Sequence, residues 1–203
     1  MKSNRNYKRG EAFRDARLFV IACEGALREK AYFEHLCPLS PRLRVEIISP
    51  QNEENDNVGN SSPNWVLERV VKFVEKEGIN IKNGDRIWFV LDVDRWGKAL
   101  YDIQAECQKN NWQMALSNPC FEVWLWLHFR DIVESKAVTC KEFKAEIHQE
   151  YEGGYKVDIF TKPEFYELAQ QRAKKIDTES GFMPNPKTTK VYLLLNDLFE
   201  ILA

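Results

Sequence analysis

The fold is decided by a short apolar run at residues 85–92, which read DRIWFVLD. The centre of this run is unbroken by polar residues and rich in strand-forming side chains, so it predicts a strand. An apolar centre of this kind indicates burial on both faces, which is typical of a parallel sheet covered by helices on both sides. The run therefore predicts an α/β fold.

Other strands and helices are predicted on either side of this run. The further predicted strands are residues 17–23 (RLFVIAC), 42–48 and 112–116. Helical composition occupies residues 26–36, 63–77 and 98–110, the second of these starting at Ser62-Pro63 and stopping at Gly78. Strands that alternate with helices indicate βαβ units, so we predict a mostly parallel four-strand sheet with flanking helices.

The pattern changes after Ser117, where helical segments dominate to the end of the chain. A polar, turn-rich loop is predicted at residues 49–63. At 203 residues the chain suits one domain. We divide it into a basic N-terminal tail at 1–16 and a single domain at 17–203. That domain has a core at 17–130 and a helical C-terminal extension at 131–203.

Composition restricts the class of protein. The formal net charge of −2 argues against a general nucleic-acid coat, although the first seventeen residues carry six Lys/Arg against two acids. That excess is compatible with a local nucleic-acid patch or with a solvated tail. No apolar run approaches the roughly 20 residues that a membrane span needs, and no signal peptide stands at the N-terminus. We therefore expect a cytoplasmic protein that does not bind a membrane.

The five cysteines are scattered along the chain and form no CxxC pair. This spacing suggests neither a disulfide framework nor a zinc knuckle. We expect reduced thiols, most of them buried.

Carboxylates stand where two of the predicted strands end. Glu24 follows the first strand, and Asp92 and Asp94 close the strand at 85–92. In a parallel α/β sheet, functional groups collect beyond the carboxyl ends of the strands. Residues i and i+2 of a strand face the same side, so Asp92 and Asp94 are expected to point together.

These acids need a positive partner, because two carboxylates about 4 Å apart repel by about 4 kcal/mol at an effective dielectric near 20. Nearby in the sequence, Arg28, Arg95 and Lys98 are candidates. A divalent cation is the stronger candidate, since Mg²⁺ prefers oxygen ligands and typically takes one or two carboxylates. A turn or helix-cap role is the alternative for a single strand-end Asp.

The segment SNPCFEVWLWLHF at residues 117–129 predicts a deeply packed helix, with Asn118 as its cap and Pro119 in the first position. Glu122 is its one acid. It either gains from the helix dipole in the first turn or joins the strand-end carboxylates, and a buried acid there needs a partner. We expect His128 to be a hydrogen-bonded core histidine.

Five motifs in this order resemble the RloB-like, AbiLii-type proteins. They are FVIACEG (19–25), FVLDVDR (89–95), SNPCFEVWLWLHF (117–129), GGYKVD (153–158) and NPKTTKVYLLL (185–195). The resemblance spans most of the chain, and the SNP-x-FE-x-W string is its most specific element. It implies a Toprim-like fold (Rossmannoid) and a role in bacterial phage defence or abortive infection, often beside an AAA/ABC-type ATPase encoded nearby.

The same resemblance implies a nuclease that depends on Mg²⁺ or Mn²⁺ and acts on nucleic acid, DNA or RNA. Glu24 maps onto the glutamate that acts as general acid/base or metal ligand, and Asp92 and Asp94 map onto the metal-binding DxD motif. Glu122 belongs to the SNP-x-FE motif and is a further catalytic candidate. In the C-terminal motifs, Lys156 and, less strongly, Lys190 are candidate phosphate partners. Asn185 or Thr188 is expected to cap a helix that binds an anion.

Two other functions remain open at this stage. A nucleotidyl-transferring Toprim enzyme would make bonds instead of breaking them, and a non-enzymatic partner would dock on an ATPase and use the carboxylates as a structural ion site. The chain has no GxxxxGK[ST] motif, so any ATPase must act in trans. A homo-oligomer is also open, because the sequence does not fix the oligomeric state.

Overall fold

The computed structural model describes residues 16–37, 40–50, 62–93, 96–151, 154–178 and 180–202. Its centre is one five-stranded sheet of order β2-β1-β3-β4-β5. The strands are β1 Arg17–Cys23, β2 Leu43–Ile48, β3 Arg86–Asp92, β4 Gln113–Asn118 and β5 Thr188–Thr189. The first four run parallel to one another, as predicted from the alternation of strands and helices.

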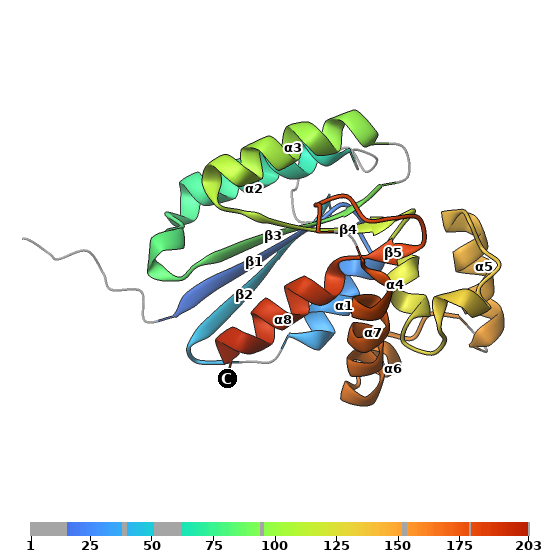
Figure 1. Ribbon diagram of the computed structural model, residues 1–203. Helices are drawn as coiled ribbons and strands as arrows, with labels where there is room; N and C mark the ends of the chain where they lie inside the picture. Colours follow the sequence, from blue (N-terminus) through green and yellow to red (C-terminus); the bar gives the residue numbers. More distant parts are fainter. Residues whose placement is uncertain are drawn as a thin grey trace, which may run out of the picture.

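Helices cover both faces of the sheet (Figure 1). The α-helices of the described residues are α1 Arg28–Leu36, α2 Pro63–Glu77, α3 Gly97–Asn110, α4 Glu122–Trp126, α5 Cys140–Glu150, α6 Val157–Phe160, α7 Pro163–Ile176 and α8 Val191–Leu202. One face carries α2 and α3, the other carries α1 and α8, and α4 to α7 gather at one end of the sheet (Figure 1). None of the described helices is long and apolar enough to cross a membrane.

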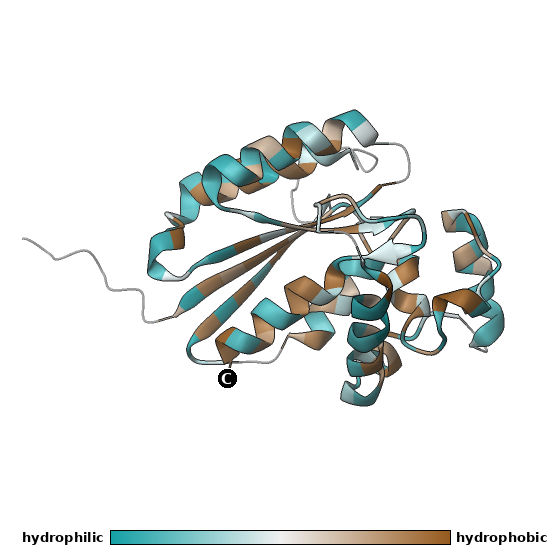
Figure 2. Cartoon of the chain, viewed as in Figure 1, coloured by the Kyte–Doolittle hydropathy of each residue, from teal (hydrophilic) through white to brown (hydrophobic). Residues whose placement is uncertain are grey.

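Two apolar clusters form the core, one on each face of the sheet. Alternate residues of β1 divide between them, with Phe19 and Ile21 in the cluster that includes α4 and α8, and Val20 and Ala22 in the cluster that includes α2 and α3. Figure 2 shows the corresponding apolar colouring along the strands and on the inner sides of the helices. Burial on both faces explains why the strands read as continuous apolar runs.

The strand order reverses between β1 and β3. From β1 the chain crosses to β2 on one side and then returns to place β3 on the other side of β1. Ligands of open α/β sheets bind at such a reversal, beyond the carboxyl ends of the strands. Glu24 and Asp92 stand at these two strand ends.

The prediction of a four-strand sheet was wrong by one strand. The fifth strand, β5, has two residues and is antiparallel, with Ser117 paired to Thr189 and Asn118 paired to Thr188. A strand of two threonines carries no apolar alternation. It forms because the end of β4 offers an open edge, which sequence periodicity does not reveal.

The segment at 117–129 differs from its predicted form. Asn118 is the last residue of β4, and its bond to Pro119 is cis. The α-helix that follows has only five residues, beginning at Glu122, so Asn118 is not a helix cap. Deep burial was predicted correctly, because every residue from Phe121 to His128 is buried. Most of the predicted polar loop at 49–63 and nearly all of the basic tail at 1–16 lie outside the described residues.

Candidate functional site

Glu24 is fixed at the point where β1 and β3 end together. Its backbone N–H donates to the Val90 carbonyl at 3.1 Å, which extends the β1–β3 pairing by one residue. Its carboxylate accepts from the backbone N–H of Asp92 at 3.1 Å and from the indole N–H of Trp96 at 2.8 Å. These two donors, one to each carboxylate oxygen, hold Glu24 against Asp92.

Asp92 links β3 to the turn after β4. Its Oδ1 accepts from the backbone N–H of Phe121 at 2.9 Å. Burial raises the pKa of Asp92 well above its usual range, and the negative charges of Glu29, Glu24 and Glu122 raise this pKa further. The structure therefore brings Glu24 and Asp92 together as expected, in a place where negative charge accumulates.

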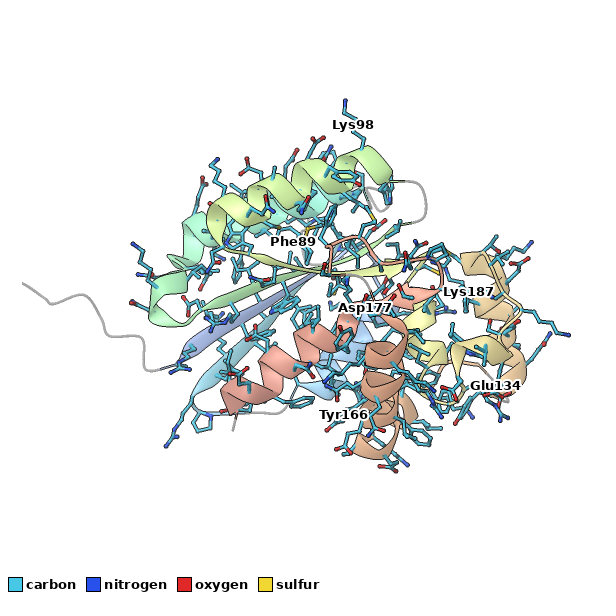
Figure 3. All side chains as sticks on the ribbon, viewed as in Figure 1. Phe89, Lys98, Glu134, Tyr166, Asp177 and Lys187 are labelled. Carbon is cyan, nitrogen blue, oxygen red and sulfur yellow. The ribbon has the colours of Figure 1, made fainter. Side chains whose placement is uncertain are left out.

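Glu122 is buried beside two cations. It is the first residue of α4, with only 6% of its side chain exposed, and its Oε1 lies 2.6 Å from Arg28 Nη1 and 3.6 Å from Lys144 Nζ. The expectation that this acid needs a partner is confirmed. Of the three cations proposed near the carboxylates, Arg28 fills this role, whereas Lys98 points into solvent from α3 (Figure 3). Arg95 lies outside the described residues.

A fourth acid, Glu29, was missed in the sequence. It lies in the first turn of α1, and its carboxylate folds over Gly25, where an added Cβ would overlap it. Burial raises the pKa of Glu29, and the Glu122 charge raises it further, while Lys144 and Arg28 lower it. A glutamate five residues after Glu24, at the start of a helix, was the available signal. Any side chain at position 25 would displace it.

The five cysteines are all free, as expected, and Cys23, Cys107 and Cys120 are buried. Cys120 and Cys140 are close to the carboxylates. A hydrogen bond from the Cys120 thiol to the Cys140 side chain, together with burial, raises the pKa of Cys120 above its usual range. Cys120 is therefore a neutral thiol that packs the turn before α4, and it is not suited to act as a nucleophile.

Of the remaining residues predicted for the site, Asp94 lies outside the described residues. Lys156 is exposed at the start of α6. Lys190 is buried and donates to both oxygens of Asp177 at 2.8 Å, so it is committed to an ion pair. The prediction that Asn185 or Thr188 caps a helix was wrong, because Thr188 is in β5 and α8 begins at Val191.

The described carboxylates suit a hard cation by charge and by chemistry. Glu24, Glu29, Asp92 and Glu122 bring four carboxyl groups together, against the two cations Arg28 and Lys144. Within the described residues, no three of the His, Cys, Asp and Glu side chains are arranged to hold a metal ion. Mg²⁺, however, typically takes only one or two carboxylates and completes its shell with water and phosphate oxygens. Glu24 and Asp92 fit that requirement.

A family model described as RloB-like protein matches residues 19–198. The matched range contains Glu24, Glu29, Asp92 and Glu122. No curated protein and no solved structure matches the chain.

Proposed function

The chain belongs to the RloB-like family, and we propose that it is a metal-dependent nuclease that hydrolyses phosphodiester bonds in DNA or RNA. The observation that carries this proposal is the contact between Glu24 and Asp92 at the strand reversal. Ligand sites of α/β sheets occur at this position, and buried carboxylates with raised pKa values are frequent at functional sites. A Toprim-like assignment of the fold is part of the same proposal.

In this proposal, Glu24 and Asp92, together with Asp94, hold Mg²⁺ or Mn²⁺. The bound ion would stabilise the attacking and leaving oxygens of the phosphodiester. Glu24, whose carboxylate oxygens accept from the Asp92 and Trp96 N–H groups, would hold the metal or accept a proton from the attacking water. Glu122 pairs with Arg28 and Lys144 and would brace the turn that presents the Phe121 N–H to Asp92.

The biological setting is also a proposal. The sequence motifs of the chain resemble those of AbiLii-type proteins. This resemblance supports a role as the effector of phage defence or abortive infection, together with an AAA/ABC-type ATPase. The chain carries no GxxxxGK[ST] motif, so it would depend on that partner for nucleotide hydrolysis. Lys156, exposed at the start of α6, would contact the substrate backbone.

A cleavage assay tests the proposal. The full chain is incubated with plasmid, single-stranded DNA and tRNA in Mg²⁺, Mn²⁺ or EDTA, with and without the neighbouring ATPase. We expect metal-dependent cleavage that falls about 100-fold or more in Asp92→Asn, because the ion's stabilisation of the transition state is worth several kcal/mol. Asp102→Asn, at an exposed position on α3, is the matched control and should cleave like the parent.

Two results would overturn the proposal. The first is full cleavage by Asp92→Asn. The second is a parent chain that cuts none of the three substrates with either metal, with the ATPase present. Incorporation of labelled nucleotide without cleavage would indicate a nucleotidyl-transferring enzyme instead.

A further inference from the structure

Two cations from distant parts of the chain converge on one carboxylate oxygen. Arg28 opens α1 and Lys144 lies in the middle of α5, yet both approach Oε1 of Glu122, at 2.6 and 3.6 Å. Among the described residues, Glu122 is the ion-pair partner of both. The two cations therefore share one carboxylate as their ion-pair partner.

Exposure of the three side chains is unequal. The side chain of Glu122 is 6% exposed, whereas Arg28 is 38% exposed and Lys144 is 51% exposed. A guanidinium has five N–H donors and an ammonium has three. The buried carboxylate thus fixes one end of each cation, and the rest of each charged group faces solvent.

These cations stand beside the candidate metal ligands. Both lower the pKa of Glu29, and the charge of Glu122 raises the pKa of Asp92, so the six groups share one electrostatic environment. A phosphodiester carries negative charge and would be repelled by the carboxylates alone. Exposed cations at the rim of the acidic cluster provide the attraction that the acids lack.

We propose that Arg28 and Lys144 form a phosphate-binding site for the backbone of the nucleic acid that enters the carboxylate cluster. This inference rests on the proposed nuclease function. The planar guanidinium of Arg28 is suited to grip two phosphate oxygens, and the ammonium of Lys144 adds a single mobile charge. Glu122 positions both cations and does not itself touch the substrate.

The alternative role for the two cations is to neutralise buried Glu122. The salt dependence of binding separates the two roles, because each phosphate contact releases counterions from the nucleic acid. A cation that only neutralises Glu122 would change the stability of the fold and leave this dependence unaltered.

The experiment measures binding of the full chain to fluorescein-labelled single-stranded DNA, duplex DNA and RNA by fluorescence anisotropy. Titrations run over a series of KCl concentrations, in EDTA and in Ca²⁺. We expect Arg28→Gln and Lys144→Gln each to weaken binding about tenfold or more. Each should also reduce the slope of log Kd against log salt by about one. Lys175→Gln, at an exposed position on α7, should match the parent.

A conservative variant keeps the test informative where a Gln variant loses stability in a thermal melt. Arg28→Lys retains the charge, so its salt slope should equal that of the parent while its affinity falls with the loss of the planar fork. If the parent binds and both Arg28→Gln and Lys144→Gln keep its affinity and salt slope, this inference is overturned. The proposed nuclease function is not affected by that result. A parent that binds none of the three nucleic acids would overturn both this inference and the proposed nuclease.

Discussion

The carboxyl group of Asp92 is buried beside three other acids, and its pKa is raised first by that burial and then by their charges. An acid whose pKa is raised on folding resists ionisation in the folded state. Its charge therefore opposes folding at pH values above the normal pKa of an Asp. Without a cation, neutral pH places Asp92 in this unfavourable range.

Asp92→Asn removes this charge and keeps the shape, including an oxygen that can accept from the Phe121 N–H. We expect the variant to be as stable as the parent, or more stable, in urea unfolding at pH 7 with EDTA. The advantage should shrink as the pH falls and the parent Asp92 becomes protonated. A large loss of stability in EDTA would contradict this account, and Asp102→Asn is the control for an exposed carboxylate.

His128 makes stability depend on pH in the opposite direction. It is fully buried, its Nε2 is 3.1 Å from the Tyr32 hydroxyl, and its Nδ1 is 2.9 Å from the Trp124 carbonyl. A carbonyl can only accept, so Nδ1 carries the proton, Nε2 accepts from Tyr32, and the ring is neutral. Burial lowers the pKa of His128 to about 3, from its ordinary value of 6.5.

At pH values between the folded and unfolded pKa of His128, about 3 and 6.5, the unfolded chain binds a proton at this residue that the folded chain does not. The free energy of unfolding should therefore fall by about 1.4 kcal/mol per pH unit on acidification from about pH 6 to pH 3 through this group. Urea unfolding across this range should show a shallower loss in His128→Gln than in the parent. His35→Gln, at an exposed position on α1, should keep the parent slope, and equal slopes in all three proteins would refute the assignment.

At the residue scale, the sequence predicted the acids that follow strands. Glu24 and Asp92 were found because parallel strands end at one edge of the sheet, and the structure places them in contact. Glu29, Arg28 and Lys144 were not identified as a group, because their meeting depends on the directions of α1 and α5. Lys144 is far from Arg28 in the sequence, and no local pattern predicts that both contact Glu122. The catalytic roles of Glu24, Asp92, Asp94, Glu122 and Lys156 remain predictions.

Among the elements, α4 has only five residues, and all five are buried. Trp124 is fully buried in it and packs edge-on against Tyr32 and His128, with ring centroids 6.4 and 5.1 Å apart. We expect Trp124→Ala to lower the free energy of unfolding by about 3–5 kcal/mol, because the surrounding residues cannot fill the cavity. Trp124→Phe keeps most of the apolar area and should cost less. Urea unfolding measures both, and an Ala variant as stable as the Phe variant would mean that α4 is not held by this side chain.

The junction of β5 with α8 depends on a buried ion pair. Lys190 and Asp177 have side chains 5% and 3% exposed, and Asp177 also accepts from the Tyr192 hydroxyl at 3.0 Å. Figure 3 shows Asp177 close to α7 and α8, within the body of the molecule. Lys190→Met should cost about 3–5 kcal/mol, because it removes the ion-pair partner of a buried carboxyl group. The double variant Lys190→Met/Asp177→Leu should recover most of this loss in thermal and urea unfolding, and an additive loss would show that the pair does not interact.

Element boundaries show what sequence periodicity can and cannot supply. The predicted strand at 17–23 agrees with β1 at both ends, since a buried run is bounded by polar residues. The strand predicted from residue 85 begins at Arg86, because the Asp85 side chain accepts from the backbone N–H groups of Leu18 and Asn80, both at 2.8 Å. Apolar patterning does not encode such a side-chain bond, nor does it encode the β4–β5 edge pairing.

At the scale of the whole molecule, a bound cation should stabilise the folded chain. Any ligand that binds only the folded state stabilises it by about 2.7 kcal/mol at a concentration 100 times its Kd. For a chain of this size, that corresponds to a rise in Tm of about 5–10 °C. We expect Mg²⁺ or Mn²⁺ to produce this rise, EDTA to reverse it, and Asp92→Asn to abolish most of it. An equal rise in the parent and the variant, at matched ionic strength, would place the ion elsewhere.

The α/β class and the mostly parallel sheet were predictable because each strand and helix carries its own local signal. The order of the strands in the sheet was not predictable, since it depends on which buried surfaces meet after the chain has collapsed. That order nevertheless determines the site: the reversal between β1 and β3 is what places Glu24 beside Asp92. The alternation of strands and helices in the sequence thus predicts that a site forms at the carboxyl edge of a parallel sheet. Tertiary packing determines that β1 and β3 are the two strands that bear it.

The late position of β5 has a consequence for the timing of protein synthesis. The end of β4 is held by residues much later in the sequence: Asn118 donates to the Pro184 carbonyl at 3.0 Å, and the Ser117 and Thr189 hydroxyls are 2.8 Å apart. The turn that follows delivers the Phe121 N–H to Asp92. On a ribosome, Glu24 and Asp92 emerge long before residues 184–189 are translated. A nascent chain therefore lacks the brace for this turn until residues 184–189 have been made, and the contact between the Phe121 N–H and Asp92 would form only after that point.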